Sequence, residues 1–309
     1  IYLTFMDIDF FKKTRILDAG MGQELLYKGL KPKGTLWSAH ALIEKNCHKM
    51  VVDAHLAFIN AGAEVIVTST FTARKNRLIQ NDSEKYFEEI NIKAVELAQK
   101  ARDISKKDIL IAGGLPNQKQ TYSADLGKDL NAIEKNFFDQ AKLLKNGIDF
   151  FYLDVMSSGL ECEIALKAIE AYNIPVLVGI HLKDDGKLPS GETINDIVTK
   201  YKNNNWLGII AACVSPKAYE LIINDLQKVE IPYGFKLNAF KKIPEGYTVA
   251  SKDQWGNAGN PNTVLGVNSD LNESNFYEYV KKFKENGATI LGGCCEIRPS
   301  HIKEIAKLI

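Results

Sequence analysis

The stretch Thr289-Ile-Leu-Gly-Gly-Cys-Cys295 is a short apolar run that ends in two glycines and two adjacent cysteines. Asn286-Gly-Ala288 precedes it and contains the kind of glycine that commonly ends a helix, while Pro299 follows at a position typical of the first turn of another helix. An apolar run of this length between two helical segments predicts a buried parallel strand over residues 289–292. The number of similar runs in the chain then decides the fold.

Seven comparable runs come earlier, separated by longer segments whose apolar residues lie three and four positions apart. This alternation is typical of a parallel sheet with crossover helices. The predicted strands are residues 15–18, 64–69, 109–113, 150–155, 175–180, 207–211, 233–237 and 289–292. The predicted helices are residues 50–60, 84–103, 130–146, 159–172, 194–203, 216–229, 275–286 and 299–308. Eight strands predict an α/β fold, the (β/α)8 TIM barrel, and the lack of any dividing linker predicts a single domain over residues 1–309.

The composition is that of an ordinary globular protein, with 45% apolar and 25% charged residues in a chain of 309. Lys and Arg number 39 against 38 Asp and Glu, so no overall field favours nucleic acid or an anionic membrane. No apolar run approaches the roughly 18 residues of a membrane span. Residues 1–11 lack the basic segment of a secretory signal. We therefore expect a cytoplasmic protein with small-molecule partners, and nothing in the composition specifies its oligomeric state.

Three of the five cysteines follow predicted strands. Cys213 lies just beyond the sixth strand, and Cys294 and Cys295 lie just beyond the eighth. The carboxyl ends of barrel strands share one rim, so these thiols can meet above the barrel. Gly292 and Gly293 allow the bend that turns two consecutive side chains towards one ion. Three thiolates select zinc and leave its fourth position open, which is the catalytic pattern.

The alternative is that each cysteine is a small buried apolar residue, the usual role of a free thiol. We favour that interpretation for Cys47 and Cys162, which fall in helical segments. His301, six residues beyond Cys295, is a less favoured fourth ligand.

Residues 238–268 form a long stretch without periodicity, after the seventh predicted strand. Such stretches are uncommon in compact domains unless they are functional. Because the loops after barrel strands build the active site, we expect this one to border it. The alternative is a mobile surface loop.

Three features of the sequence resemble the homocysteine S-methyltransferase family. They are the motif Gly292-Gly-Cys-Cys295 with Pro299-x-His301, the distant Cys213 before Ser215-Pro216, and the opening Leu17-Asp-Ala-Gly-Met-Gly-Gln-Glu-Leu25. Collinear, weaker matches are Leu36-Trp-Ser-Ala39, the segment 61–71 and the segment 183–188. The resemblance spans nearly the whole chain. It implies a barrel with a catalytic zinc on three cysteines, and a methyltransferase that methylates the thiol of homocysteine to give methionine.

The resemblance also implies residues for the amino-acid end of homocysteine. Family members bind its ammonium with acidic residues at the ends of strands one and four, where this chain has Asp18 and Asp154. Backbone amides near Ala19 and Gly20, with the Thr68 hydroxyl, would bind its carboxylate. The alternative for the two aspartates is capping of the loops at strand ends.

The methyl donor that the resemblance implies is an onium cation, such as S-methylmethionine or another sulfonium. Aromatic faces bind such cations, and Trp37 is our candidate wall, with Phe71 and Tyr122 as further candidates. For each of these aromatic residues the alternative is a place in the core.

Three segments depart from the family pattern. Ala212 replaces a common Asn before the first cysteine, and segments 113–117 and 156–157 differ from the usual sequences after strands three and four. These departures keep two alternatives open, namely a betaine-type donor and a non-catalytic barrel that binds zinc or homocysteine.

Overall fold

All eight predicted strands are present in the computed structural model, which describes residues 8–309. Residues 1–7, which belong to the segment tested above for a secretory signal, lie outside the described residues. The strands are β1 (Arg15–Ile16), β2 (Val65–Val67), β3 (Leu110–Pro116), β4 (Phe150–Met156), β5 (Val176–Ile180), β6 (Trp206–Val214), β7 (Tyr233–Leu237) and β8 (Ile290–Gly293).

The strands pair in parallel as one sheet in the order β1-β8-β7-β6-β5-β4-β3-β2. The two ends of this order meet, because Leu17 forms a parallel bridge with Val65 and the Asp18 amide donates to the Val65 carbonyl at 2.9 Å. The sheet is therefore closed into a barrel, as the strand count predicted.

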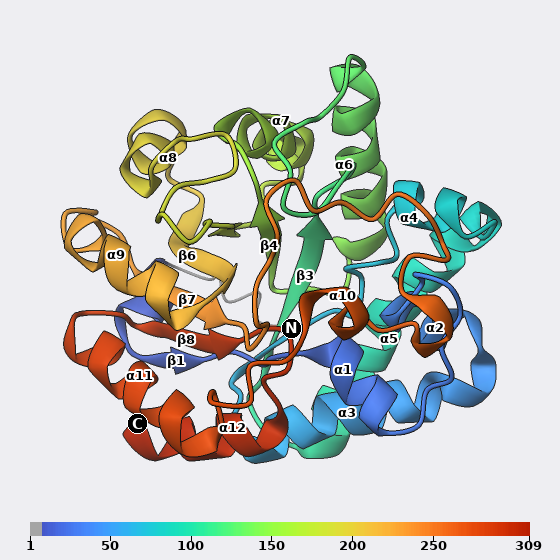
Figure 1. The fold of residues 1–309 in the computed structure, drawn as a ribbon, viewed down its shortest axis with the longest axis horizontal. Coiled ribbons are helices and arrows are strands. Elements are labelled where there is room, and N and C mark those ends of the chain that lie inside the picture. Colours follow the sequence, from blue (N-terminus) through green and yellow to red (C-terminus); the bar gives the residue numbers. More distant parts are fainter. Residues whose placement is uncertain (1–7) are drawn as a thin grey trace.

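The helices form the outer ring in Figure 1. They are α1 (Met21–Tyr27), α2 (Ser38–Ile43), α3 (His48–Ala61), α4 (Lys75–Gln80), α5 (Phe87–Ser105), α6 (Leu130–Leu144), α7 (Gly159–Ile169), α8 (Ile194–Tyr201), α9 (Pro216–Leu226), α10 (Asn262–Leu265), α11 (Glu273–Glu285) and α12 (Pro299–Ile305). None of the helices in residues 8–309 is long and apolar enough to cross a membrane.

Every predicted helix is found, and several begin at a side-chain cap just beyond a strand. Ser158 accepts a hydrogen bond from the Glu161 amide at the start of α7, and Ser215 caps α9 in the same way, ahead of Pro216. The sequence analysis did not predict α1, α2, α4 or α10, which have four to seven residues. Helices this short show too little of the 3.6-residue period to be detected without a further signal, such as the Pro299 that marks the start of α12.

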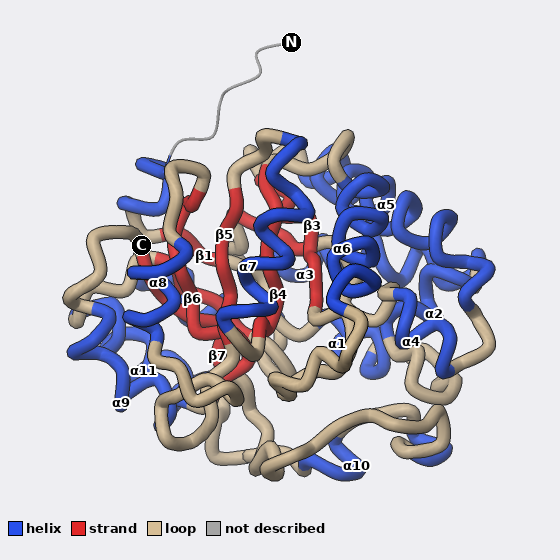
Figure 2. The backbone as a smooth tube through the Cα atoms, turned by 90° about the horizontal axis from the view of Figure 1, so that it is seen from above, coloured by secondary structure: helices blue, strands red, loops and turns tan. Residues whose placement is uncertain are grey.

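The barrel interior is packed with large apolar side chains from alternate strands. Leu17, Val65, Phe150 and Leu207 are among its fully buried residues. Phe11, from the turn Ile8–Lys12, packs edge to face on Phe150 with ring centroids 5.8 Å apart. At the other end, the segment 238–268 crosses the carboxyl ends of the strands and carries α10 (Figure 2). A site at the carboxyl ends of the strands would therefore lie beneath this segment.

Barrel closure between β7 and β8 depends on Gly234. A Cβ atom there would lie 1.8 Å from the backbone oxygen of Ile290, the residue paired with it across the strands. We expect Gly234→Ala to lower the free energy of unfolding by about 4 kcal/mol or more, since backbone cannot move aside. Thermal unfolding followed by circular dichroism measures this.

Gly246→Ala is the matched control. A Cβ atom at Gly246 meets nothing within 4 Å, although its φ of 71° favours glycine. Its cost should be about 1–2 kcal/mol. Equal melting temperatures for the two variants would contradict the close contact between β7 and β8.

Candidate metal centre and active site

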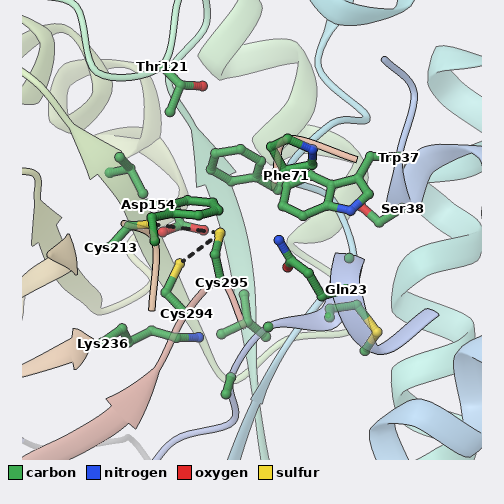
Figure 3. Close-up of a pocket in the computed structure, with 18 of the residues that line it drawn as sticks. Gln23, Trp37, Ser38, Phe71, Thr121, Asp154, Cys213, Lys236, Cys294 and Cys295 are labelled. Atoms are coloured by element: carbon green, nitrogen blue, oxygen red, sulfur yellow. Dashed lines mark hydrogen bonds between the residues drawn. The ribbon is translucent and has the colours of Figure 1, made fainter. Parts of the chain in front are cut away.

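The three cysteines after β6 and β8 converge on one point. The Cys213 and Cys294 sulfurs each lie 3.8 Å from the sulfur of Cys295, and all three are within 4.8 Å of one another (Figure 3). All are free thiols. Among residues 8–309 this is the one cluster of His, Cys, Asp or Glu with metal-ligand geometry. Cys47 and Cys162 lie elsewhere, in the turn Lys45–Cys47 and in α7.

The spacing of the sulfurs suits a tetrahedral metal. Zinc–sulfur bonds of about 2.3 Å place two tetrahedral ligands about 3.8 Å apart. Cys213 and Cys295 are buried, and Cys294 is partly exposed to the pocket. Three soft ligands at this spacing therefore fit zinc without rearrangement.

Irregular strand ends direct two of the site residues. The register of β6 against β7 shifts between Ala212 and Val214, so that Cys213 is an extra residue with a φ of 56°. A similar shift in β4 leaves Val155 at a φ of 66°, directly after Asp154. Bulges turn side chains out of the regular strand alternation, and strained backbone is concentrated at functional sites.

Polar groups surround Cys213. The Tyr122 hydroxyl lies 3.1 Å from its sulfur, and the Asn238 amide nitrogen donates to its carbonyl oxygen at 2.6 Å. That nitrogen also lies 3.7 Å from the sulfur. Tyr122 and Asn238 thus make the polar contacts to Cys213 that the Ala212 side chain cannot make. Such contacts orient metal ligands.

The same contacts favour the thiolate of Cys213. Burial raises the pKa of its thiol, but hydrogen bonds with Cys294, Cys295 and Tyr122 outweigh burial and lower the pKa well below its usual value. The hydrogen bond with Cys213 raises the pKa of Cys294.

His301, the less favoured ligand, is engaged elsewhere. Its Nε2 lies 3.1 Å from the Leu271 carbonyl oxygen, and its Nδ1 accepts from the Arg298 amide at 3.2 Å. Both ring nitrogens therefore have partners outside the cysteine cluster.

Asp18 lies at the bottom of the pocket and is paired with a residue that the sequence analysis missed. Lys236, on β7, donates to one carboxylate oxygen of Asp18 at 2.8 Å, and the Val67 amide donates to the other at 2.8 Å. Only 6% of Lys236 and 1% of Asp18 is exposed. The sequence signal for this pair was a charged lysine inside the predicted strand 233–237. Its partner could not be identified from the sequence, because Asp18 is 218 residues away.

Asp154 opens onto the same pocket, near Cys213 in Figure 3. Burial and then the charge of Cys294 raise the pKa of its carboxyl to about 7, although Lys236 acts in the opposite direction. The site therefore holds two carboxyl groups, three thiols and one ammonium within a single pocket.

The groups predicted to receive a substrate carboxylate differ in availability. The Gly20 amide already donates to the Ile297 carbonyl oxygen at 3.1 Å. The Thr68 hydroxyl oxygen accepts from the Gly114 amide at 3.0 Å and lies 3.0 Å from the Thr70 hydroxyl oxygen. The Ala19 amide makes no hydrogen bond to any residue in the described part of the chain.

An aromatic wall faces the cysteines across the pocket. Trp37 packs edge to face against Phe71 and Trp255, with ring centroids 6.4 and 5.7 Å away. Gly22 makes room for it, because a Cβ there would lie 2.1 Å from the Trp37 ring. Gln23 points from α1 into the same space (Figure 3), and both polar atoms of its amide are buried without a hydrogen-bond partner.

The segment 238–268 borders the site, as expected. It contributes six of the pocket residues, namely Phe240, Tyr247, Val249, Trp255, Pro261 and Leu265. The Gln80 side-chain amide donates to the Val249 carbonyl oxygen at 2.8 Å, so the segment is tied to α4. It is a wall of the pocket and not a loose surface loop.

Comparison with known proteins places this geometry in context. Residues 15–309 match the family model described as Homocysteine S-methyltransferase. The chain is 23% identical to a selenocysteine methyltransferase from Astragalus bisulcatus, over 96% of this chain and 93% of that protein. It is 24% identical to Homocysteine S-methyltransferase 1 from Brassica oleracea var. italica, over 94% of this chain and 92% of that protein.

The fold has a close counterpart among solved structures. The metallated form of the homocysteine methyltransferase MmuM from Escherichia coli superposes with a TM-score of 0.76 at 19% identity, covering 96% of each chain. Two features agree with the match to the family model, namely the closed eight-stranded barrel and the three-cysteine cluster at its carboxyl rim. The chain therefore belongs to the homocysteine S-methyltransferase family, a family of methyltransferases.

Proposed function

We propose that the protein transfers a methyl group from a sulfonium donor, such as S-methylmethionine, to the thiol of homocysteine, and that Cys213, Cys294 and Cys295 hold a catalytic zinc. The observation that carries the proposal is the meeting of three thiols at tetrahedral spacing in the same pocket as an aromatic wall. Family membership supports homocysteine as the acceptor.

Zinc bound by three thiolates would leave one position for the substrate sulfur and lower its pKa, so that it is a thiolate at neutral pH. The reaction is an in-line displacement at the methyl carbon. A new sulfur–carbon bond forms to homocysteine, the sulfonium–carbon bond breaks, and its electron pair leaves with the donor as a neutral sulfide. The thiol proton of homocysteine passes to solvent.

The protein's own groups would fix the acceptor. Asp154 faces the pocket and would receive the ammonium of homocysteine together with Asp18, whose carboxylate retains acceptor capacity. The substrate carboxylate needs other donors, since Gly20 and Thr68 are already engaged. The Ala19 amide and the remaining N–H groups of Lys236 are free donors beside the two aspartates.

The donor would lie against Trp37 and Phe71, whose ring faces and edges line the side of the pocket opposite the thiols. A methylsulfonium group is attracted to an aromatic face by about 0.5–2 kcal/mol, more when water is excluded. Such a wall also allows the sulfide product to leave once its charge is lost.

The proposal predicts which cysteines bind zinc. We expect Cys213→Ala, Cys294→Ala or Cys295→Ala to reduce bound zinc to below about a tenth of the wild-type content, because two thiolates cannot complete the site. Elemental analysis of purified protein measures the zinc-to-protein ratio. Cys47→Ala and Cys162→Ala are matched controls that should keep it unchanged. Equal zinc loss in the Cys47 variant would assign the metal to other residues.

The activity itself is tested with homocysteine and a panel of methyl-labelled donors that includes S-methylmethionine and betaine. We expect labelled methionine from the sulfonium donor and little from betaine. Chelation of zinc should abolish the reaction, and added zinc should restore it. No labelled methionine from any donor, despite one zinc per chain, would leave a barrel that binds without turning over.

Lys236 should act on binding of the acceptor. Loss of a hydrogen bond to a charged group costs about 1.5–3 kcal/mol, so Lys236→Met should raise KM for homocysteine about 10- to 100-fold while changing KM for the donor little. Lys236→Arg should restore part of the affinity. Steady-state kinetics with each substrate varied in turn measure the split.

Two controls accompany this variant. Asp18→Asn combined with Lys236→Met removes both buried charges, so its melting temperature, compared with that of Lys236→Met alone, measures the cost of the unpaired carboxylate. Lys282→Met removes an exposed lysine whose partner is Glu220 on α9, outside the pocket. A change in kcat alone would assign Lys236 to a purely structural role.

A further inference from the structure

Two arginines beside the pocket are buried without an acidic partner. Arg74 is 0% exposed and Arg77 is 2% exposed. Within residues 8–309, neither guanidinium has a carboxylate oxygen within 4.0 Å. A charge removed from water is costly unless it is paired and hydrogen-bonded, so this arrangement needs an explanation.

Arg74 is partly satisfied. Its Nη2 donates to the Thr121 hydroxyl at 2.8 Å, and its guanidinium lies 5.2 Å from the centroid of the Phe71 ring. Glu161 and Asp154 act on it from further away and partly offset the burial that lowers its pKa to about 10. Arg74 therefore has polar, aromatic and longer-range acidic partners.

Arg77 has far less. It lies in α4 and lines the pocket, and the ring centroid of Trp255 lies 5.3 Å from its guanidinium carbon. Its Nε and Nη1 have no hydrogen-bond partner. Burial and then the charge of Arg74 lower the pKa of Arg77, so the neighbouring cation adds to the cost. The residue is positioned by packing but not neutralised.

A guanidinium with free N–H groups binds a carboxylate through two parallel hydrogen bonds. Trp255 lies over the Arg77 guanidinium, and Nε and Nη1 are shielded, whereas Nη2 makes no hydrogen bond within residues 8–309 and is not fully buried. Nη2 is therefore the nitrogen that a ligand in the pocket can reach first. The pocket that Arg77 lines is continuous with the three thiols and the Trp37 wall. A ligand that spans the pocket could therefore contact an aromatic wall with a cationic end and Arg77 with an anionic end.

We propose that Arg77 is the anion-binding residue of the donor subsite, and that the methyl donor is a zwitterion whose carboxylate pairs with it. This inference rests on the proposed methyl transfer. It assigns a ligand class to a residue that lies outside the cysteine cluster and outside the groups proposed to hold homocysteine. Donors that lack an anionic group would leave Arg77 unpaired and bind weakly.

The test uses the zinc-loaded full chain and two donors that differ in one group, S-methylmethionine and S-methylmethionine carboxamide. We expect wild-type protein to show a KM about 10- to 100-fold lower for the carboxylate donor, as a charge-assisted pair should give. Arg77→Gln should remove this preference by raising the KM for the carboxylate donor alone. Arg77→Lys, which keeps the charge without the planar fork, should restore part of it.

The matched control is Arg102→Gln, at the end of α5, where the arginine is partly exposed and pairs with Asp103 and Asp149. It should leave both KM values unchanged. Equal KM values for the two donors in wild-type protein, or an equal change for both donors in Arg77→Gln, would overturn the proposal.

A second measurement is independent of turnover. S-methylmethionine should raise the melting temperature of the wild-type protein more than the carboxamide does, and Arg77→Gln should abolish that difference. If the wild-type protein makes no methionine from any donor, this shift in melting temperature still tests whether Arg77 binds the carboxylate. Loss of methyl transfer and loss of anion binding are therefore separate results. A variant that unfolds is recognised by its circular dichroism spectrum, and Arg77→Lys then carries the test.

Discussion

The convergence of three sulfur atoms from two separate strand ends is the constraint on which the rest of the site depends. Strands β6 and β8 flank β7, so their ends lie two strand spacings apart, and in a regular strand the Cys213 side chain would simply alternate with its neighbours between the two faces of the sheet. The extra residue in β6 and the φ of 56° at Cys213 turn its sulfur towards Cys295. Tyr122 and Asn238 then hold that conformation through the sulfur and the carbonyl oxygen. The regular strands of the barrel hold the site in place, and the irregular end of β6 sets the direction of the Cys213 side chain.

Charge is distributed along the pocket in a definite order. At one end, Asp18, Asp154 and the thiols surround the single ammonium of Lys236. At the other end, Arg77 lies among aromatic and apolar side chains with no acid beside it. Trp37, Phe71 and Leu265 line the same pocket. Two amino-acid-like substrates that meet at their sulfur atoms would each find a cationic side chain for a carboxylate, one at either end.

The fold was predictable because buried parallel strands are continuous apolar runs and because glycine turns separate them. The cysteine cluster was predictable because Gly292 and Gly293 mark a bend just where two thiols follow a strand. The pairing of Lys236 with Asp18 was not, since it depends on the register of β7, β8 and β1 across 218 residues. Arg77 was missed for a related reason. A charged residue in a short helical segment is ordinarily exposed, whereas Arg77 is buried, with Trp255 from a distant segment packed on it.

The pocket is lined by two parts of the fold, namely the strand ends and the segment 238–268. The thiols and the acidic groups belong to strand ends, whose positions the whole barrel fixes, whereas Trp255, Tyr247 and Val249 belong to the later part of this connection, beyond Asn238 and its contact with Cys213. Sequence change in that connection can reshape the space around the methyl donor while the sulfur cluster keeps its geometry. A barrel with this division can change its methyl donor during evolution while the residues around the acceptor's sulfur stay the same.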